Sequence, residues 1–320
     1  MLHYLLVTLP KIKKPKKWHF LFAAIALAGG LLLWQKIFTP NQHAQAQAQV
    51  APKPPFAVNP TWPDTAAAAA MGVEGYGVVA SHGAQQKRPI ASIAKVITAL
   101  TILDKHPLKM GEEGPSIPIT EQDEQLYRDY VAKNGTVVLV KARTSLTLHQ
   151  ALEAMLLPSA NNVADTAATW AFGSIEDYHK AARDMLKKYD LKDTVVGGDA
   201  SGLNPATQST ASDLVKLGEK ALQNPVIAQI VSQPSAEIPI AGVVPNYNAM
   251  VTKYGFSGIK PGESIEASNT LLFSAKHTIH GKAINIIGAV LGTDSYKVSN
   301  AAALDLMASL RKNIDDAGAQ

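Results

Sequence analysis

The stretch PIASIAKVITAL, residues 89–100, places a serine and a lysine three positions apart at the start of an apolar run. On a helix this spacing puts both side chains on one face, with the Lys95 nitrogen in reach of the Ser92 oxygen. Neighbours such as Ile93 and Val96 leave the lysine poorly solvated, which lowers its pKa and lets the neutral amine accept a proton. The stretch therefore fits a nucleophile beside its base, or a lysine that lies along a core helix and reaches solvent.

The composition of the 320-residue chain is that of a globular protein, with 47% hydrophobic and 18% charged residues. The absence of cysteine excludes a disulfide framework, a thiolate nucleophile and a Cys-ligated metal. The formal charge of +4 arises at the N-terminus, because six of the 30 basic residues and no acidic residue lie at or before Lys36. The rest has 24 basic and 26 acidic residues, so nothing in it indicates nucleic-acid binding.

The first sixty residues differ in kind from the rest of the chain. KIKKPKKW carries five lysines, and an uncharged stretch from His19 to Trp34 follows it. Positive charge before a stretch of nearly membrane-spanning length predicts a cytoplasmic basic segment (1–17) and a single-pass transmembrane anchor (18–38). A flexible Ala/Gln/Pro-rich linker (39–60) then leads to an extracytoplasmic domain (61–320) on a bacterial cell membrane. The alternative is a signal peptide that is cleaved at an Ala-x-Ala site in HAQAQAQV.

The order of the predicted elements indicates the fold class. EGYGVVAS (74–81) alternates as a strand does, and the helix that starts near Ser92 follows it. The middle of the chain is mainly helical in pattern, with one more strand-like run at 135–142. Three strand candidates follow Gly255 and precede a final helix (299–313). Strands at both ends most simply share one antiparallel sheet, so we expect an α+β domain with an inserted helical subdomain.

Two further short motifs accompany SIAK (92–95), namely SAN (159–161) and KPG (260–262). Ser-x-Asn occurs once in the chain, where Pro158 interrupts a helical pattern, so both side chains can point out of the break. Each motif alone has an ordinary interpretation, a helix end capped by small polar residues for SAN and a turn between strands for KPG. Together, in this order and with gaps of 67 and 101 residues, the three are much more specific.

With these motifs the chain resembles the penicillin-binding D-alanyl-D-alanine carboxypeptidases, relatives of the serine β-lactamases that use Ser-x-x-Lys, Ser-x-Asn and Lys-Thr-Gly. The likeness covers about residues 62–309 and extends to the blocks LLPSANNVADTAA and SGLNPATQSTASDL. It implies a β-lactamase/transpeptidase-like fold and a serine D,D-carboxypeptidase that removes the terminal D-alanine of peptidoglycan stem peptides. It also implies β-lactams as acylating inhibitors and a role in peptidoglycan biosynthesis, the cell wall and cell shape.

The resemblance also implies roles for individual residues of the first two motifs. Ser92 is the nucleophile, acylated by the carbonyl of the penultimate D-alanine, and Lys95 is its base. Ser159 relays the proton to the leaving D-alanine, and Asn161 holds the peptide amide.

The third motif supplies the substrate-binding strand on this resemblance. Lys260 provides positive charge for the terminal carboxylate, Gly262 leaves its backbone free, and the Glu263 N–H joins that of Ser92 in holding the oxyanion. Pro261 departs from the family pattern, because it takes the place of threonine and lacks both a hydroxyl and an N–H. Proline is tolerated in a strand at the edge of a sheet, so we expect an edge strand here and a slow but active enzyme.

Other functional classes fit the sequence less well. A β-lactamase shares the acylation residues, but no clear Glu-x-x-x-Asn element follows SAN to activate a deacylating water. An α/β-hydrolase is disfavoured because Gly-x-Ser-x-Gly does not occur. A metallohydrolase is disfavoured because His-Glu-x-x-His does not occur, and we expect His277 and His280 on a solvated hairpin, so no metal site is predicted. A non-catalytic cell-wall-binding protein, inactive because of Pro261, is the alternative from a different class.

Overall fold

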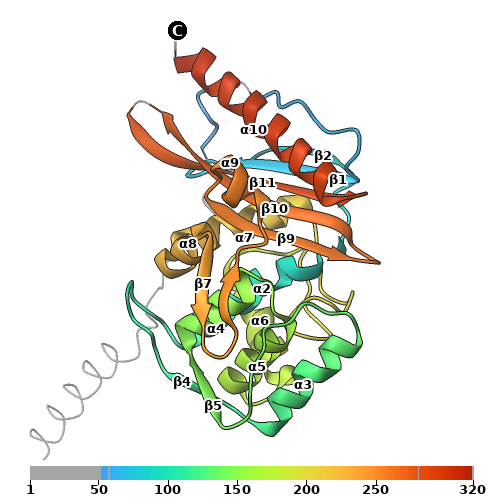
Figure 1. Cartoon of the computed structure of the whole chain (residues 1–320). Helices are drawn as coiled ribbons and strands as arrows, with labels where there is room; N and C mark the ends of the chain where they lie inside the picture. The colour runs from blue at the N-terminus through green and yellow to red at the C-terminus, as the bar shows by residue number, and fades with distance from the viewer. Residues whose placement is uncertain (1–51, 57, 280, 319–320) are drawn as a thin grey trace, which may run out of the picture. The chain divides into compact units, whose positions relative to one another are not determined.

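A five-stranded antiparallel sheet with the strand order β2-β1-β11-β10-β9 forms the frame of the structure (Figure 1). The computed structural model describes residues 52–56, 58–279 and 281–318. The strands of this sheet are β1 (Ala68–Val73), β2 (Gly77–Gly83), β9 (Gly258–Ser264), β10 (Ser268–Ile279) and β11 (Lys282–Thr293). Because β1 pairs with β11, the prediction that strands from both ends of the domain share one sheet is confirmed.

The other elements are helices and short two-stranded ladders. The helices are the 3₁₀ helix η1 (Ala91–Ile93) and the α-helices α2 (Ala94–Lys105), α3 (Glu121–Ala132), α4 (Leu148–Leu156), α5 (Asn161–Phe172), α6 (Ile175–Lys188), α7 (Ala211–Gln223), α8 (Pro225–Ser232), α9 (Ala249–Tyr254) and α10 (Tyr296–Gly318). The ladders are β3 (Arg88–Pro89) with β6 (Gln208–Ser209), β4 (Ser116–Ile119) with β5 (Thr144–Thr147), and β7 (Ser235–Ile238) with β8 (Gly242–Pro245).

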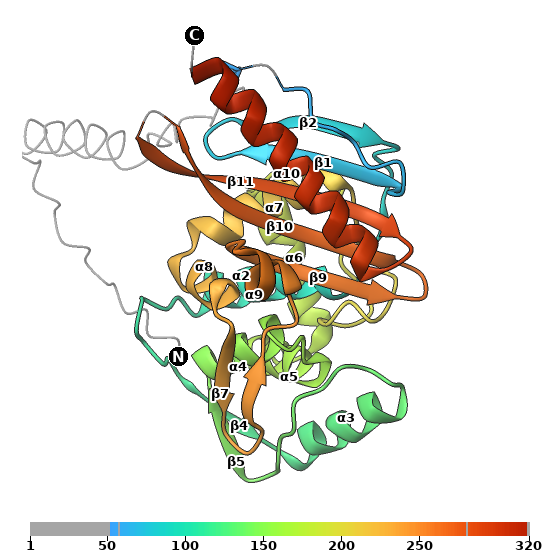
Figure 2. The ribbon, with the colours of Figure 1, turned by 45° about the horizontal axis from the view of Figure 1, so that its top comes forward.

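The central strand β11 is apolar on both faces, because helices cover the sheet on both sides. Ile286 and Val290 lie in the cluster that contains Leu306 of α10, while Ile287 and Leu291 lie in the larger cluster on the opposite face. This alternation is the two-residue period of a strand. Figure 2 shows α10 crossing one face of the sheet and α7 lying behind the other. The sheet therefore forms the middle layer of three.

Helix α2 is the centre of the inserted helical subdomain. Ten of its twelve residues are buried, and it contacts α4, α5, α6 and α7. A helix that is apolar on all sides must lie in a core, so the run after SIAK dictates this position. As a result α2 begins at the boundary between the sheet and the helical subdomain (Figure 2). The predicted α+β arrangement with an inserted helical subdomain is confirmed.

Two details of the predicted strands differ from the structure. The strand expected at 74–81 is present as β2, but the alanine-rich strand β1 before it was not predicted. The strand expected at 135–142 is wrong, because this segment forms no strand. Its backbone groups are paired by a side chain instead: Asn162 Oδ1 accepts from the Val138 N–H (3.1 Å), and Asn162 Nδ2 donates to the Val138 carbonyl (2.9 Å). The segment thus buries its valines without a neighbouring strand.

The predicted N-terminal segments lie mostly outside the described residues. This holds for 1–17, for 18–38 and for the linker up to residue 51. In the last part of the linker, Phe56 packs edge-on against Tyr76, with 6.0 Å between the ring centroids. Within the described part of the chain, no helix combines the length and apolar character that crossing a membrane requires.

Candidate active site

The turn into α2 holds Ser92 at the surface of a cavity. Ser92 lies in the 3₁₀ helix that leads directly into α2, after Ala91, whose φ of 44° is unusual for a residue with a side chain. Gly202 packs on this turn so closely that an added Cβ would come within 2.1 Å of the Ala91 carbonyl oxygen. Because only glycine fits there, the loop that carries Gly202 fixes the backbone before Ser92.

Lys95 lies beneath Ser92, and none of its surface is exposed. Its Nζ is 3.0 Å from Ser92 Oγ, 2.7 Å from Asn161 Oδ1 and 2.9 Å from the Ser201 carbonyl oxygen. The two carbonyl oxygens can only accept hydrogen bonds. A neutral amine that donates both of its N–H groups to them directs its lone pair at the remaining neighbour, which is the hydroxyl of Ser92.

The protonation state of Lys95 supports this arrangement. Burial lowers the pKa of Lys95 from 10.5 to about 7, although the negative charges of Asp199 and Asp165 act in the opposite direction. A substantial fraction of Lys95 is therefore a free amine at neutral pH. Such an amine can take the proton of a neighbouring hydroxyl, which is the condition for activating a serine nucleophile.

Ser159 and Asn161 occupy the break between α4 and α5. Helix α4 ends at Leu156, and Ser159 adopts a left-handed φ of 69° before α5 starts at Asn161. The Asn161 N–H donates to the Thr136 carbonyl (2.8 Å), which ties the start of α5 to the loop after α3. The predicted helix break at Pro158 is thus present, and both side chains line the same cavity as Ser92.

Strand β9 forms the other wall of the cavity and carries the third motif. It is an edge strand, because β10 is its only neighbour in the sheet, so the predicted edge position of Pro261 is confirmed. A Cβ added at Gly262 would lie 3.1 Å from the Ser92 backbone nitrogen and 2.9 Å from the Ile90 carbonyl oxygen. The absence of a side chain at this position is therefore what lets β9 pass directly beside the amide of the serine.

Lys260 is a second fully buried lysine in this region. Burial, and after it the charge of Lys95, holds the pKa of Lys260 well below 10.5. Two ammonium groups so close together in a buried site would repel each other, so at most one of Lys95 and Lys260 is readily charged.

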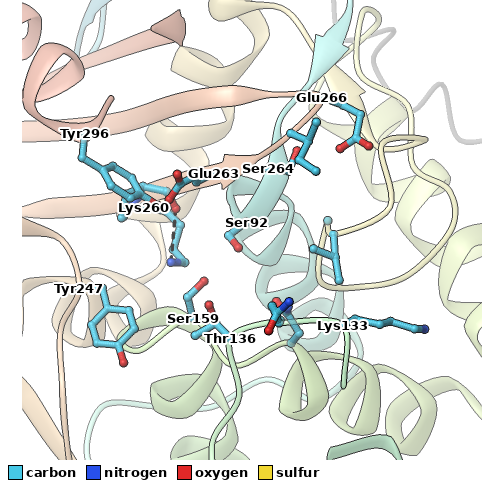
Figure 3. A pocket seen from close by; sticks show the side chains of 17 residues that line it. Ser92, Lys133, Thr136, Ser159, Tyr247, Lys260, Glu263, Ser264, Glu266 and Tyr296 are labelled. Atoms are coloured by element: carbon cyan, nitrogen blue, oxygen red, sulfur yellow. Dashed lines mark hydrogen bonds between the residues drawn. The ribbon is translucent and has the colours of Figure 1, made fainter. Parts of the chain in front are cut away.

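The cavity has a volume of about 540 Å³. Ser92, Ser159 and Lys260 point into the same space (Figure 3). Two tyrosines, Tyr247 and Tyr296, lie at one end, and the charged Lys133 and Glu266 lie at the other. Five of the seven predicted site residues line this cavity, and Lys95 and Gly262 lie directly behind it. The lining residues that the sequence interpretation missed are Lys133, Asn134, Gly135, Thr136, Gly202, Leu203, Tyr247, Ile265, Glu266 and Tyr296.

No local signal in the sequence identifies these residues as part of a site. They come from five separate segments, and only the fold brings them together. Glu263, which was predicted, lies beside Tyr296, and burial together with the Glu263 carboxylate raises the pKa of the Tyr296 hydroxyl. His277, expected on a solvated hairpin, contacts Asp315 of α10 at 2.9 Å, and His280 lies outside the described residues.

The chain matches the family model described as D-alanyl-D-alanine carboxypeptidase, Peptidase S11, over residues 56–295. It belongs to this family. One curated relative is the D-alanyl-D-alanine carboxypeptidase DacB2 of Mycobacterium tuberculosis, 30% identical over 62% of this chain and 66% of the relative. Another is the D-alanyl-D-alanine endopeptidase of Escherichia coli, 27% identical over 65% of this chain and 69% of the relative. The matched part of this chain thus spans about two thirds of these relatives' length.

Solved structures show the same fold. The Streptomyces K15 DD-transpeptidase superposes with a TM-score of 0.68 at 22% identity, over 79% of this chain and 98% of that one. A penicillin-binding protein homolog from Mycobacterium tuberculosis gives a TM-score of 0.66 at 26% identity, over 80% and 96%. The expected β-lactamase/transpeptidase-like fold is confirmed, and the family is one of serine peptidases, which are hydrolases.

Proposed function

We propose that this protein is a serine D,D-carboxypeptidase that removes the terminal D-alanine of peptidoglycan stem peptides through an acyl-enzyme on Ser92. The observation that carries the proposal is the environment of Lys95. Its amine has two neighbours that only accept hydrogen bonds, so its lone pair faces the Ser92 hydroxyl at 3.0 Å. With a pKa lowered by burial to about 7, it is free to act as a base at neutral pH.

Acylation then follows from the positions of these groups. Ser92 Oγ attacks the carbonyl of the penultimate D-alanine as its proton passes to Lys95 Nζ. The negative charge that develops on the carbonyl oxygen is stabilised by the backbone N–H groups of Ser92 and Glu263, on the turn before α2 and on β9. Such donors are commonly worth several kcal/mol in the transition state.

The C–N bond then breaks, and the leaving amine needs a proton. Ser159, which lines the same cavity, passes a proton from the lysines to this nitrogen, and D-alanine leaves. Water afterwards attacks the ester carbonyl with Lys95 again as base, and this step releases the shortened peptide and restores the Ser92 hydroxyl. Asn161 holds the peptide amide, and Lys260 in its ammonium form pairs with the terminal carboxylate.

The location of the enzyme is part of the proposal. Residues 18–38 anchor the chain in the bacterial cell membrane, and the domain faces the extracytoplasmic side, where peptidoglycan lies. The support is the run of lysines before an uncharged stretch. β-Lactams, which acylate serine D,D-peptidases, are the expected inhibitors.

Two measurements on the full chain test this function. Intact-mass spectrometry after incubation with benzylpenicillin should show one covalent adduct, which is absent in Ser92→Ala. Release of D-alanine from a pentapeptide that ends in D-Ala-D-Ala should be lost in the same variant. An adduct that persists in Ser92→Ala would assign the nucleophile elsewhere, and rapid turnover of penicillin without accumulation would indicate a β-lactamase.

A second candidate, a cell-wall-binding protein with impaired catalysis, rests on Pro261. This residue lines the cavity where the family pattern has a threonine, and it offers no hydroxyl to a substrate. A chain that binds stem peptides but forms no penicillin adduct and releases no D-alanine would support this alternative.

A further inference from the structure

Two carboxylates lie behind Lys95, away from the cavity that holds Ser92; that of Asp165 is buried and that of Asp199 is half-buried. Asp165 is on α5, one turn after Asn161, and Asp199 is in the loop before β6. Asp165 is 6% exposed. Neither residue touches the serine, and the reaction described above does not use them. A buried charge without a compensating role is costly, so this pair calls for an explanation.

Both carboxylates hold the short segment that carries the Ser201 carbonyl. Asp165 Oδ1 accepts from the Ala200 N–H at 2.8 Å. Asp199 Oδ1 accepts from the Ser201 N–H at 2.9 Å and from the Gly202 N–H at 2.6 Å. The Ser201 carbonyl in turn accepts from Lys95 Nζ at 2.9 Å. Asp199 is therefore connected to the base through the peptide unit between Ser201 and Gly202, and Asp165 holds the residue before Ser201.

No other cation neutralises the pair. Across residues 52–56, 58–279 and 281–318, no nitrogen of a basic side chain lies within 4.0 Å of either carboxylate. Tyr130 of α3 donates its hydroxyl to Asp165 Oδ2 at 2.6 Å, and that bond supplies a proton donor without a charge. Asp165 remains difficult to ionise, because burial raises its pKa to about 6.

The other titratable groups around the pair and the base do not supply this charge. The pKa of Lys260 of β9, which faces Lys95, is held well below 10.5 by burial, and the pKa of His179 of α6 is lowered by burial and by Arg183. Tyr178 of α6 stays protonated because burial raises the pKa of its hydroxyl. Lys133, after α3, lies 6.0 Å from the Tyr130 ring centre and forms no ion pair with either carboxylate. Among these groups, Lys95 is thus the one whose positive charge the two carboxylates stabilise.

The two buried lysines of the site provide an internal comparison. Both are fully buried, and burial is the main reason why the pKa of each is lowered. Lys260 has no carboxylate among the groups that act on it, and its pKa falls well below 10.5. Lys95 has Asp199 and Asp165, and its pKa stays at about 7. The carboxylate pair is therefore a feature that distinguishes the surroundings of Lys95 from those of Lys260.

We propose that Asp165 and Asp199 are positioning residues that keep Lys95 an effective base. Their charges offset the burial of the amine, and their hydrogen bonds fix the Ser201 carbonyl that orients it. This inference rests on the proposed function, since it assigns a purpose to the base of that reaction. It concerns the two acidic residues of the segments SANNVAD and GGDASG, which the three motifs do not include.

The first test is the pH dependence of acylation by a fluorescent penicillin, measured on the full chain. For the unaltered protein the rate should rise with pH through a midpoint near 7, where Lys95 loses its proton. Asp165→Asn keeps the shape of the side chain but removes the charge, so the midpoint should fall by about one pH unit, a tenfold change in the free-amine fraction. The high-pH plateau should fall several-fold, because a less basic amine is a weaker proton acceptor.

The matched control is Asp129→Asn. Asp129 and Asp165 line a second cavity, separate from the one that holds Ser92, but Asp129 is exposed, so the same substitution removes the same charge from a solvated position. Its midpoint should not move, because solvent screens that charge. If Asp165→Asn folds poorly, Tyr130→Phe provides the test: loss of the 2.6 Å hydrogen bond favours protonated Asp165, so a smaller shift in the same direction is expected.

A second readout separates this inference from the proposed function. The ¹³C shift of Lys95 Cε, assigned with Lys95→Arg in uniformly lysine-labelled protein, reports its titration without any activity. A lower midpoint in Asp165→Asn than in Asp129→Asn supports the inference even if no penicillin adduct forms. Equal midpoints in the two variants would overturn it, even in an enzyme that is fully active through Ser92.

Discussion

Replacing Lys95 by methionine should change how the stability of the fold depends on pH. The pKa of Lys95 is about 7 in the folded protein and 10.5 in the unfolded chain. Between these values the unfolded chain binds a proton that the folded protein does not bind. The free energy of unfolding of the unaltered protein therefore rises with pH across this window, and the protein is least stable below pH 7.

The size of the effect follows from the two pKa values. Integrated from pH 7 to pH 10, the difference for Lys95 adds roughly 3 to 4 kcal/mol to the free energy of unfolding. Methionine has a similar length and no charge, so Lys95→Met should lose this increase. Its stability at any one pH is less informative, because the variant also leaves Asn161 Oδ1 and the Ser201 carbonyl without their donor.

Urea unfolding of the full chain at several pH values between 7 and 10, followed by circular dichroism, measures the difference in slope. Lys187→Met is the control, because the Lys187 side chain is 81% exposed and its removal should leave the pH dependence unchanged. Lys260 contributes in the same direction and is present in all three proteins. If Lys95→Met keeps the full increase to within about 1 kcal/mol, Lys95 does not have a lowered pKa, and the reasoning for it as a base fails.

Four further predictions concern the strand β9 and the N-terminus. Pro261→Thr should raise D-alanine release about ten- to a hundredfold, because a charge-assisted hydrogen bond to the substrate carboxylate is worth roughly 1.5 to 3 kcal/mol. Pro261→Val, which restores the N–H but not a hydroxyl, should not raise D-alanine release. An equal gain in both variants would contradict the hydroxyl hydrogen bond as the cause. Gly262→Ala should slow acylation at least a hundredfold, since its Cβ would lie 3.1 Å from the Ser92 nitrogen. A penicillin-labelling rate close to that of the unaltered protein would show that β9 does not need to pass so close to the Ser92 amide. Binding of a D-Ala-D-Ala peptide should take up protons at a pH below 10.5, as the carboxylate raises the lowered pKa of Lys260, and calorimetry in buffers of different ionisation enthalpy would detect this uptake. N-terminal sequencing of the membrane fraction should find residues 18–38 intact, whereas a start beyond an Ala-x-Ala site would show a cleaved signal peptide.

The sequence allowed the fold to be predicted where local pattern and tertiary environment agree. The run after SIAK is apolar on every side and forms the buried helix α2, and the strands after Gly255 alternate as their two covered faces require. Strand β1 was missed because a run of alanines has no strand preference and is held by its neighbours β2 and β11. The segment 135–142 was misassigned because its hydrogen-bond partner is the side chain of Asn162, which no local pattern indicates.

The residues of the candidate site also fall into those that a local pattern indicates and those that only the folded chain reveals. Ser92, Ser159 and Lys260 were predicted because three short motifs follow one another in the order that is typical of the family. The fold brings these three residues to one cavity. The carboxylates behind Lys95 could not be found, because Asp165 looks like an ordinary polar position within a helix. Its importance depends on burial and on its distance from a lysine 70 positions earlier, and both are properties of the folded chain.

The two buried lysines differ in the source of their counter-charge. The counter-charge of Lys95 is part of the fold and comes from Asp165 and Asp199. The amine of Lys95 can therefore gain or lose a proton near pH 7 when no ligand occupies the site. Lys260 forms no ion pair with a carboxylate in the described part of the chain, and burial holds its pKa well below 10.5. A peptide that ends in a carboxylate would therefore complete the site electrostatically, whereas a neutral analogue would leave Lys260 buried without a counter-charge. This difference gives a physical reason why a cleft with two buried lysines would select chain ends rather than internal peptide bonds, even with proline in place of the threonine hydroxyl.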